Sequence, residues 1–88
     1  MKLKYQFVTQ EVADGYVAVA VGADAQKFGG LVRMNETSSF LFSQLAAERT
    51  EKELTDALLA RYDVDEAQAG ACVAAFAEQL RREGVLED

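Results

Sequence analysis

The sequence predicts an α+β domain in which a three-stranded antiparallel sheet is followed by three helices. Residues 1–34 alternate apolar and polar side chains with a period of two, which is the pattern of half-buried β-strands. From residue 35 onward, the apolar residues recur at helical spacing instead. The chain has 88 residues without repeats or low-complexity linkers, so we expect a single domain over residues 1–88.

The first two strands are predicted to form a β-hairpin. In residues 3–7 every second side chain is apolar, so these side chains would share one face of a strand. Asp14-Gly15 is a strong signal for a tight turn. The β-branched and aromatic stretch Tyr16–Val21 would then form the returning strand.

A third strand is predicted at Leu31–Met34, which is short enough to lie at the edge of the sheet. The glycine-rich segment before it, residues 22–30, indicates a flexible connection. An edge strand presents unpaired amides and carbonyls to which an extended peptide can be added, unless a loop covers the edge instead.

Three helices are predicted from their caps. Asn35 suits the N-cap of a helix over residues 36–47. Thr50–Glu53 has the capping-box pattern that opens a second helix. Asp65 is expected to cap a third helix, which Gly84 would end in a left-handed conformation. Strands followed by helices in this order favour a winged-helix-like arrangement.

The third predicted helix carries two stripes of side chains. One stripe follows the spacing of a helix face that packs into a core; it consists of Val73, Phe76, Ala77 and Leu80. The flanking stripe is small or uncharged and consists of Gln68, Cys72, Ala75 and Gln79. A partner backbone could approach this second stripe closely, but the high helix propensity of alanine explains the composition equally well.

Composition excludes several kinds of catalytic and metal site. The chain has no histidine and a single cysteine, Cys72, which excludes a Ser-His-Asp triad, a standard zinc site and an internal disulfide. The glycines match no phosphate-binding fingerprint. We therefore expect no catalytic residue, no metal and no cofactor, and the protein is not expected to be an enzyme.

Charge and hydropathy bear on partners and location. The net charge is −6, and the cations of the third helix, Arg81 and Arg82, lie only at its end, so we expect no nucleic-acid partner. No apolar run is long enough to cross a membrane, and no apolar segment of a secretory signal follows Met1. The expected compartment is the cytoplasm.

The segment Leu31–Thr37, followed by Phe40–Phe42 and Leu45, resembles the hydrophobic-Asn-Glu-Thr signature of the PqqD-like proteins. Those proteins are named after the pyrroloquinoline quinone biosynthesis protein D. The resemblance continues through Arg49–Leu54, which looks like the family's Arg-Thr-x-x-Glu-Leu segment. It covers about residues 16–86, and it is the order and spacing of the matching positions that make it specific.

This resemblance implies a recognition element for the precursor of a ribosomally made, post-translationally modified peptide. Members of the family bind an unstructured leader peptide as an added strand on the third β-strand, beside the third helix. They present it to a modifying enzyme, frequently a radical S-adenosylmethionine (SAM) enzyme. Carried onto this chain, the resemblance assigns the strand to Leu31, Val32, Arg33 and Met34, and the helix wall to Gln68, Cys72, Ala75 and Gln79.

Two positions depart from the family pattern. Many relatives carry an acidic residue at the position of Cys72, so a thiol removes a charge from the expected groove wall. Ala47-Glu48 stands where the family often has Asp-Gly, which would change the shape of that turn.

Two other functions fit the predicted fold. One is a winged-helix module that binds DNA or a regulator, and the other is a structural subunit docked permanently on an enzyme.

If the chain instead binds a leader, proline at Val32 or Met34 is expected to remove an edge donor and weaken binding without unfolding the helices.

Overall fold

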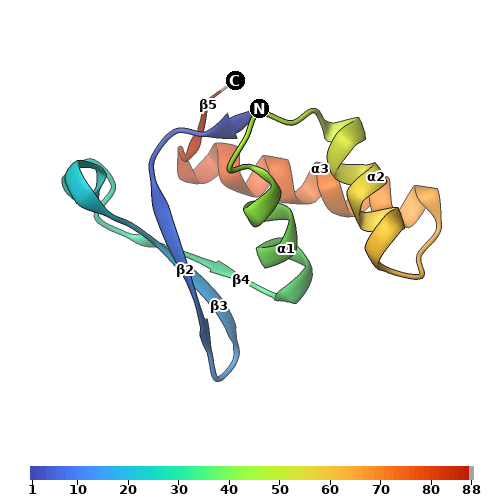
Figure 1. Ribbon diagram of the computed structural model, residues 1–88, viewed down its shortest axis with the longest axis horizontal. Coiled ribbons are helices and arrows are strands. Elements are labelled where there is room, and N and C mark those ends of the chain that lie inside the picture. Colours follow the sequence, from blue (N-terminus) through green and yellow to red (C-terminus); the bar gives the residue numbers. More distant parts are fainter. Residues whose placement is uncertain (88) are drawn as a thin grey trace.

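The computed structural model describes residues 1–87 of the chain. Its main sheet is antiparallel, in the order β2 (Phe7–Val12), β3 (Gly15–Ala20) and β4 (Leu31–Met34). Three helices follow, α1 (Glu36–Gln44), α2 (Glu51–Arg61) and α3 (Glu66–Glu83). The sheet projects from the helices on one side of the molecule (Figure 1). This confirms the predicted α+β class, with a three-stranded antiparallel sheet followed by three helices.

Two short strands join the ends of the described chain. β1 (Lys2–Leu3) pairs antiparallel with β5 (Leu86–Glu87). Next to this pair, the Lys4 N–H donates to the carbonyl of Val85 at 2.7 Å. The first predicted strand is therefore divided, because its beginning pairs with the C-terminal strand and only its end enters the main sheet. A period-two alternation is compatible with pairing to the C-terminal strand and with pairing in the main sheet, so the sequence pattern does not reveal which one occurs.

The connection between β3 and β4 is more ordered than the glycine content indicated. Residues Gly22–Gln26 form a short 3₁₀ helix, η1. The Asp24 carboxylate in it accepts a hydrogen bond from the Gln6 N–H at 2.9 Å. Phe28 stacks on the ring of Tyr5 with 5.9 Å between ring centroids. These contacts tie the segment to the first part of the chain, which the glycine content did not predict.

The β2–β3 hairpin turns through Ala13 and Asp14, and Gly15 begins the returning strand. Gly15 has a φ of +145°, a conformation that L side chains rarely adopt. A Cβ at this position would also lie 2.6 Å from the carbonyl oxygen of Met34. Both the turn and the close approach of β4 therefore require glycine here.

The core lies between the three helices and the face of the sheet that is turned toward them. β3, β4 and the three helices each contribute at least one side chain with little or no exposure. α3 supplies Val73, Phe76, Ala77 and Leu80, as its predicted stripe requires. The other members are Ala18, Val32, Met34, Leu41, Phe42, Leu45, Leu54, Leu58, Ala69 and Val85.

The predicted helix starts are confirmed by their hydrogen bonds. The Asn35 Oδ1 accepts from the Ser38 N–H at 2.8 Å, and the Asp65 Oδ1 accepts from the Gln68 N–H at 2.8 Å. Thr50 opens α2 with a reciprocal capping box. Gly84 ends α3 with a φ of +74°.

The end of α1 differs from the prediction, because the helix stops at Gln44 and not at Ala47. The N–H of Leu45 donates to the carbonyl of Phe42 at 3.1 Å, which tightens the last turn. The carbonyl of Gln44 accepts a hydrogen bond from Arg49 Nε at 3.3 Å. This arginine therefore satisfies a helix-end carbonyl, a contact that no local pattern in the sequence signals.

Candidate functional site

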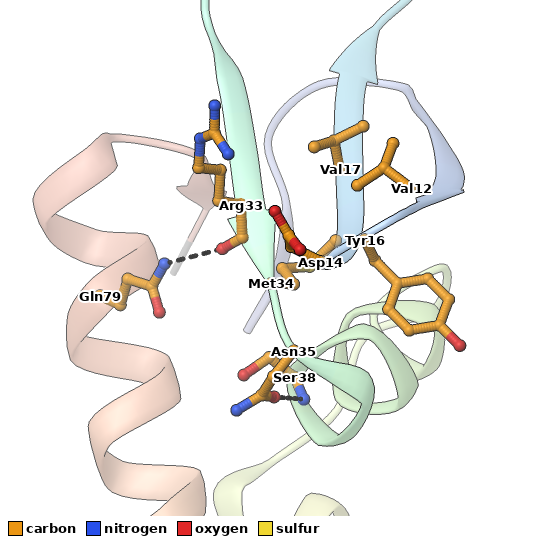
Figure 2. A pocket seen from close by; sticks show the side chains of 9 residues that line it. All are labelled: Val12, Asp14, Tyr16, Val17, Arg33, Met34, Asn35, Ser38 and Gln79. Atoms are coloured by element: carbon orange, nitrogen blue, oxygen red, sulfur yellow. Dashed lines mark hydrogen bonds between the residues drawn. The ribbon is translucent and has the colours of Figure 1, made fainter.

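β4 lies at the edge of the main sheet and pairs with β3 only. Its other edge faces α3 across a cavity, which Figure 2 shows from close by. The Gln79 side chain extends from α3 toward this edge, and its Nε2 donates to the carbonyl oxygen of Arg33 at 3.4 Å. Of the four expected wall residues, Gln79 therefore lies beside the expected edge strand.

The direction of each backbone group in β4 follows from its contacts. In a β-strand the N–H and C=O of one residue point to the same side, and successive residues alternate. The Arg33 carbonyl faces α3, so the Arg33 and Leu31 backbone groups point to the open edge. The Met34 carbonyl approaches Gly15 of β3, so the Val32 and Met34 backbone groups point into the sheet.

This geometry corrects one expectation from the sequence. Proline at Val32 or Met34 would remove an N–H that points toward β3, so it would damage the sheet. The donors that an added strand could use belong to Leu31 and Arg33. The sequence does not reveal this alternation, because it depends on how β4 is aligned with β3.

The side chains of β4 divide in the same way. Val32 and Met34 are buried in the core, whereas Leu31 and Arg33 are exposed on the face of the sheet away from the helices. The four predicted strand residues thus play different parts. Leu31 and Arg33 offer backbone groups at the open edge, Met34 lines the cavity beside it, and Val32 belongs to the core.

The four predicted residues of the helix wall also differ in their surroundings. Gln79 is half-buried, and its Nε2 also lies 3.3 Å from the Glu83 carboxylate. Ala75 is exposed and lines neither of the two cavities beside α3 described below. Gln68 is exposed and Cys72 half-buried, and both line the more apolar of these cavities.

A cavity of about 360 Å³ surrounds the end of β4. Gln79 stands on its α3 side, and the start of α1 contributes its N-cap Asn35 and Ser38 (Figure 2). Its remaining lining comes from β4 and the hairpin and consists of Val12, Asp14, Tyr16, Val17, Arg33 and Met34. The open edge is thus bordered by polar groups that can hydrogen-bond to a backbone.

A second cavity, of about 450 Å³, lies nearer the start of α3 and is mostly apolar. Besides Gln68 and Cys72, it is lined by Thr37, Leu58, Tyr62, Val64, Ala69 and Ala71. Among these, Tyr62 has a buried hydroxyl that finds no hydrogen-bond partner within the described part of the chain.

Sequence reasoning missed most of this lining. Val64 carries the one local signal, because an exposed valine between two aspartates has no evident role in the core. The other lining residues lie in α1, in α3, and in or directly after α2, so only the packing of these helices brings them together.

The described residues contain no group of three or more acidic or cysteine side chains that could hold a metal ion. Cys72 is a free cysteine. Within residues 1–87, no helix has both the length and the hydropathy needed to span a bilayer.

A small α+β domain with an open strand edge facing a helix has the geometry of modules that bind extended peptides by strand addition. The sequence profile of the family described as coenzyme PQQ synthesis protein D (PqqD) matches residues 10–86. The chain therefore belongs to the PqqD family, as the resemblance indicated. No curated protein matches the chain.

Two solved structures share the fold. One is TbiB1 in complex with the TbiA(beta) leader peptide, with a TM-score of 0.74 and 23% sequence identity; the alignment covers 99% of this chain and 95% of that chain. The other is a lasso peptide synthetase B1 complexed with the leader peptide, with a TM-score of 0.70 and 18% identity; it covers 99% and 96% of the two chains. These similarities establish the fold over nearly the whole length of both proteins.

Proposed function

We propose that this chain is a non-catalytic adaptor. It binds the leader of a ribosomally made precursor peptide as an added strand on β4 and presents the peptide to a modifying enzyme. The open edge of β4 carries this proposal, because the Arg33 backbone is turned toward α3 and away from the sheet. Membership of the PqqD family and the leader peptides bound to both similar structures support it.

The leader is bound chiefly through its backbone. Leu31 and Arg33 offer N–H and C=O groups at the open edge, which are the groups that strand addition uses. The Gln79 side-chain amide donates to the Arg33 carbonyl, which is the group that would accept a hydrogen bond from a leader N–H. This side-chain amide therefore occupies the position of a leader amide and must move when the leader binds. The carboxylate of Glu83, 3.3 Å from the same nitrogen, can accept the released amide.

One side chain of the leader anchors in the apolar cavity beside Gln68 and Cys72. Tyr62 lines that cavity, and its hydroxyl is buried without a hydrogen-bond partner among the described residues. A buried polar atom without a partner costs about 1–3 kcal/mol, so a ligand that supplies a hydrogen bond there gains from it. The mostly apolar lining of the cavity favours an apolar side chain as the anchor, and a polar atom on it that reaches the Tyr62 hydroxyl would strengthen binding.

The chemical modification belongs to the partner enzyme, which in this family is frequently a radical SAM enzyme. The adaptor's own contribution is reversible binding. Ordering a disordered leader costs about 2–5 kcal/mol, which keeps affinity moderate and allows the peptide to be handed on.

The test is an amide NMR titration of isotope-labelled protein with peptides encoded beside its gene, and with duplex DNA as a control. We expect saturable shifts in residues 31–34 and 68–79. The side-chain amide of Gln79 should shift strongly, because its hydrogen bond to Arg33 is replaced. Saturable shifts with DNA and none with any peptide would contradict the proposal.

A further inference from the structure

The main sheet has one face without a helix, which we call the outer face. Cross-strand neighbours share a face of the sheet, and successive residues alternate between faces. Because Ala18 and Val32 are buried against the helices, Val17, Val19, Leu31 and Arg33 must lie on the outer face.

β2 completes the outer face. Val8 pairs with Val19, and Val19 pairs with Leu31, so an aliphatic row crosses all three strands. Val8 is 53% exposed, Val19 39% and Leu31 44%. An antiparallel sheet with one solvated face normally carries polar residues on that face. This face is aliphatic instead, as expected of a surface that binds another protein.

The charges of the outer face also set it apart from the rest of the molecule. The chain has fifteen acidic residues, yet none occupies a strand position on this face. Gln10 and Arg33 are its polar side chains, and they lie in one row with Val17 between them. Arg33 is therefore its single charged strand residue. A complementary surface is apolar and places a carboxylate opposite this arginine.

The outer face also adjoins the edge where the leader would bind. A strand added to β4 extends the sheet, so its outward side chains continue the row of Val8, Val19 and Leu31. A protein that covers the outer face therefore touches adaptor and leader together. Such a protein distinguishes a loaded adaptor from an empty one.

We propose that the modifying enzyme docks on the outer face, over the aliphatic row and the neighbouring leader strand. This inference rests on the proposed function. A second copy of the chain fits the face less well, because two molecules of net charge −6 repel each other and a symmetric contact lacks a carboxylate for Arg33.

The test uses the leader peptide and the modifying enzyme encoded beside the gene of this chain. Enzyme binding is measured with and without leader for wild type and for the variants Val8→Asp and Val19→Asp. Leu59→Asp is the matched control, because Leu59 is an exposed apolar residue on α2. Val19→Thr, which keeps a β-branched side chain, replaces Val19→Asp if the latter does not fold.

We expect leader affinity to be unchanged in all variants. Enzyme binding to the loaded complex should weaken at least about tenfold in the Val8 and Val19 variants, as at the centre of an interface, and stay normal in Leu59→Asp. Wild-type enzyme binding in these variants would overturn the docking site. A wild-type dimer that Val19→Asp dissociates would also overturn it. Failure of wild type to bind leader would instead reject the proposed function, so the two failures are distinguishable.

Discussion

Gly15 occupies a position at which the structure requires glycine. Its φ is +145°, and a Cβ added there would lie 2.6 Å from the Met34 carbonyl oxygen, so both the backbone conformation and the available space disfavour any other residue. We therefore expect Gly15→Ala to lower the free energy of unfolding by at least about 2 kcal/mol, measured by urea denaturation. Gly29→Ala is the control, because a Cβ there meets nothing within 4 Å. Equal urea midpoints for Gly15→Ala and Gly29→Ala would show that position 15 does not require glycine.

Residues that act locally could be predicted from the sequence, whereas residues that act across the fold could not. Asn35, Asp65 and Gly84 satisfy or end a helix within a few positions of themselves, so their roles follow from their neighbours. Arg49 reaches back to the carbonyl of Gln44 only because the chain turns there. The same limit applies to Gln79, whose contact with Arg33 spans 46 positions.

At the scale of the single strand, β4 allows a sharp test of strand addition. Arg33→Pro removes an N–H that faces the open edge while leaving the hydrogen bonds to β3 in place. Losing one hydrogen bond of about 1 kcal/mol should weaken leader binding roughly fivefold or more. Isothermal titration calorimetry measures the change, with circular dichroism to verify folding.

Two further variants show whether weaker leader binding by Arg33→Pro comes from the lost backbone donor, from the lost arginine side chain or from a destabilised sheet. Arg33→Ala keeps the backbone donor and should bind the leader nearly as wild type. Val32→Pro removes a donor that faces β3 and should destabilise the protein by about 1–3 kcal/mol, since the carbonyl opposite loses its partner. Normal leader binding by folded Arg33→Pro protein would rule out strand addition at this edge.

The capping box of α2 gives that helix a pH-dependent start. The Glu53 carboxylate accepts from the Thr50 N–H at 2.9 Å, and this backbone hydrogen bond holds the pKa of Glu53 below its ordinary value of 4.5. A carboxyl whose pKa is lowered by folding stabilises the folded state above its unfolded pKa. That contribution is lost as the pH falls through the folded pKa.

We therefore expect wild type and Glu53→Gln to differ by a constant amount in stability at neutral pH. The difference should shrink as the pH falls below about 4.5, the ordinary pKa of this carboxyl. Urea midpoints for both proteins over the acidic range measure it. A gap that does not change with pH would show that the charge on Glu53 has no part in the cap.

Among the elements, the helices were predictable and the sheet only partly so. α3 has a cap at each end and an apolar stripe, which together fix its bounds at Glu66–Glu83. The strands share one alternating pattern, which does not reveal that β1 leaves the sheet to pair with β5. The apolar cavity lay beyond sequence reasoning for a related reason, because α1, α2 and α3 all contribute to it.

At the scale of the whole molecule, the C-terminal segment holds the two ends of the fold together. Val85 is fully buried, and its carbonyl accepts from the Lys4 N–H at 2.7 Å. Val85→Ala should therefore destabilise the protein by about 1.5–3 kcal/mol and leave the denaturant slope unchanged. Val64→Ala is the control, since Val64 is 38% exposed. A similar loss of stability in Val85→Ala and Val64→Ala would contradict a specific role for Val85.

Pairing of β1 with β5 brings the two ends of the described chain close together. Lys2 lies opposite Glu87, so a short linker could join the two ends, and the chain could be opened instead at the exposed Ala13–Asp14 turn. Such a circular permutant would keep β4 and α3 in place. Its new ends would lie at the tip of the hairpin, where an attached fluorophore could report on proteins that approach the sheet.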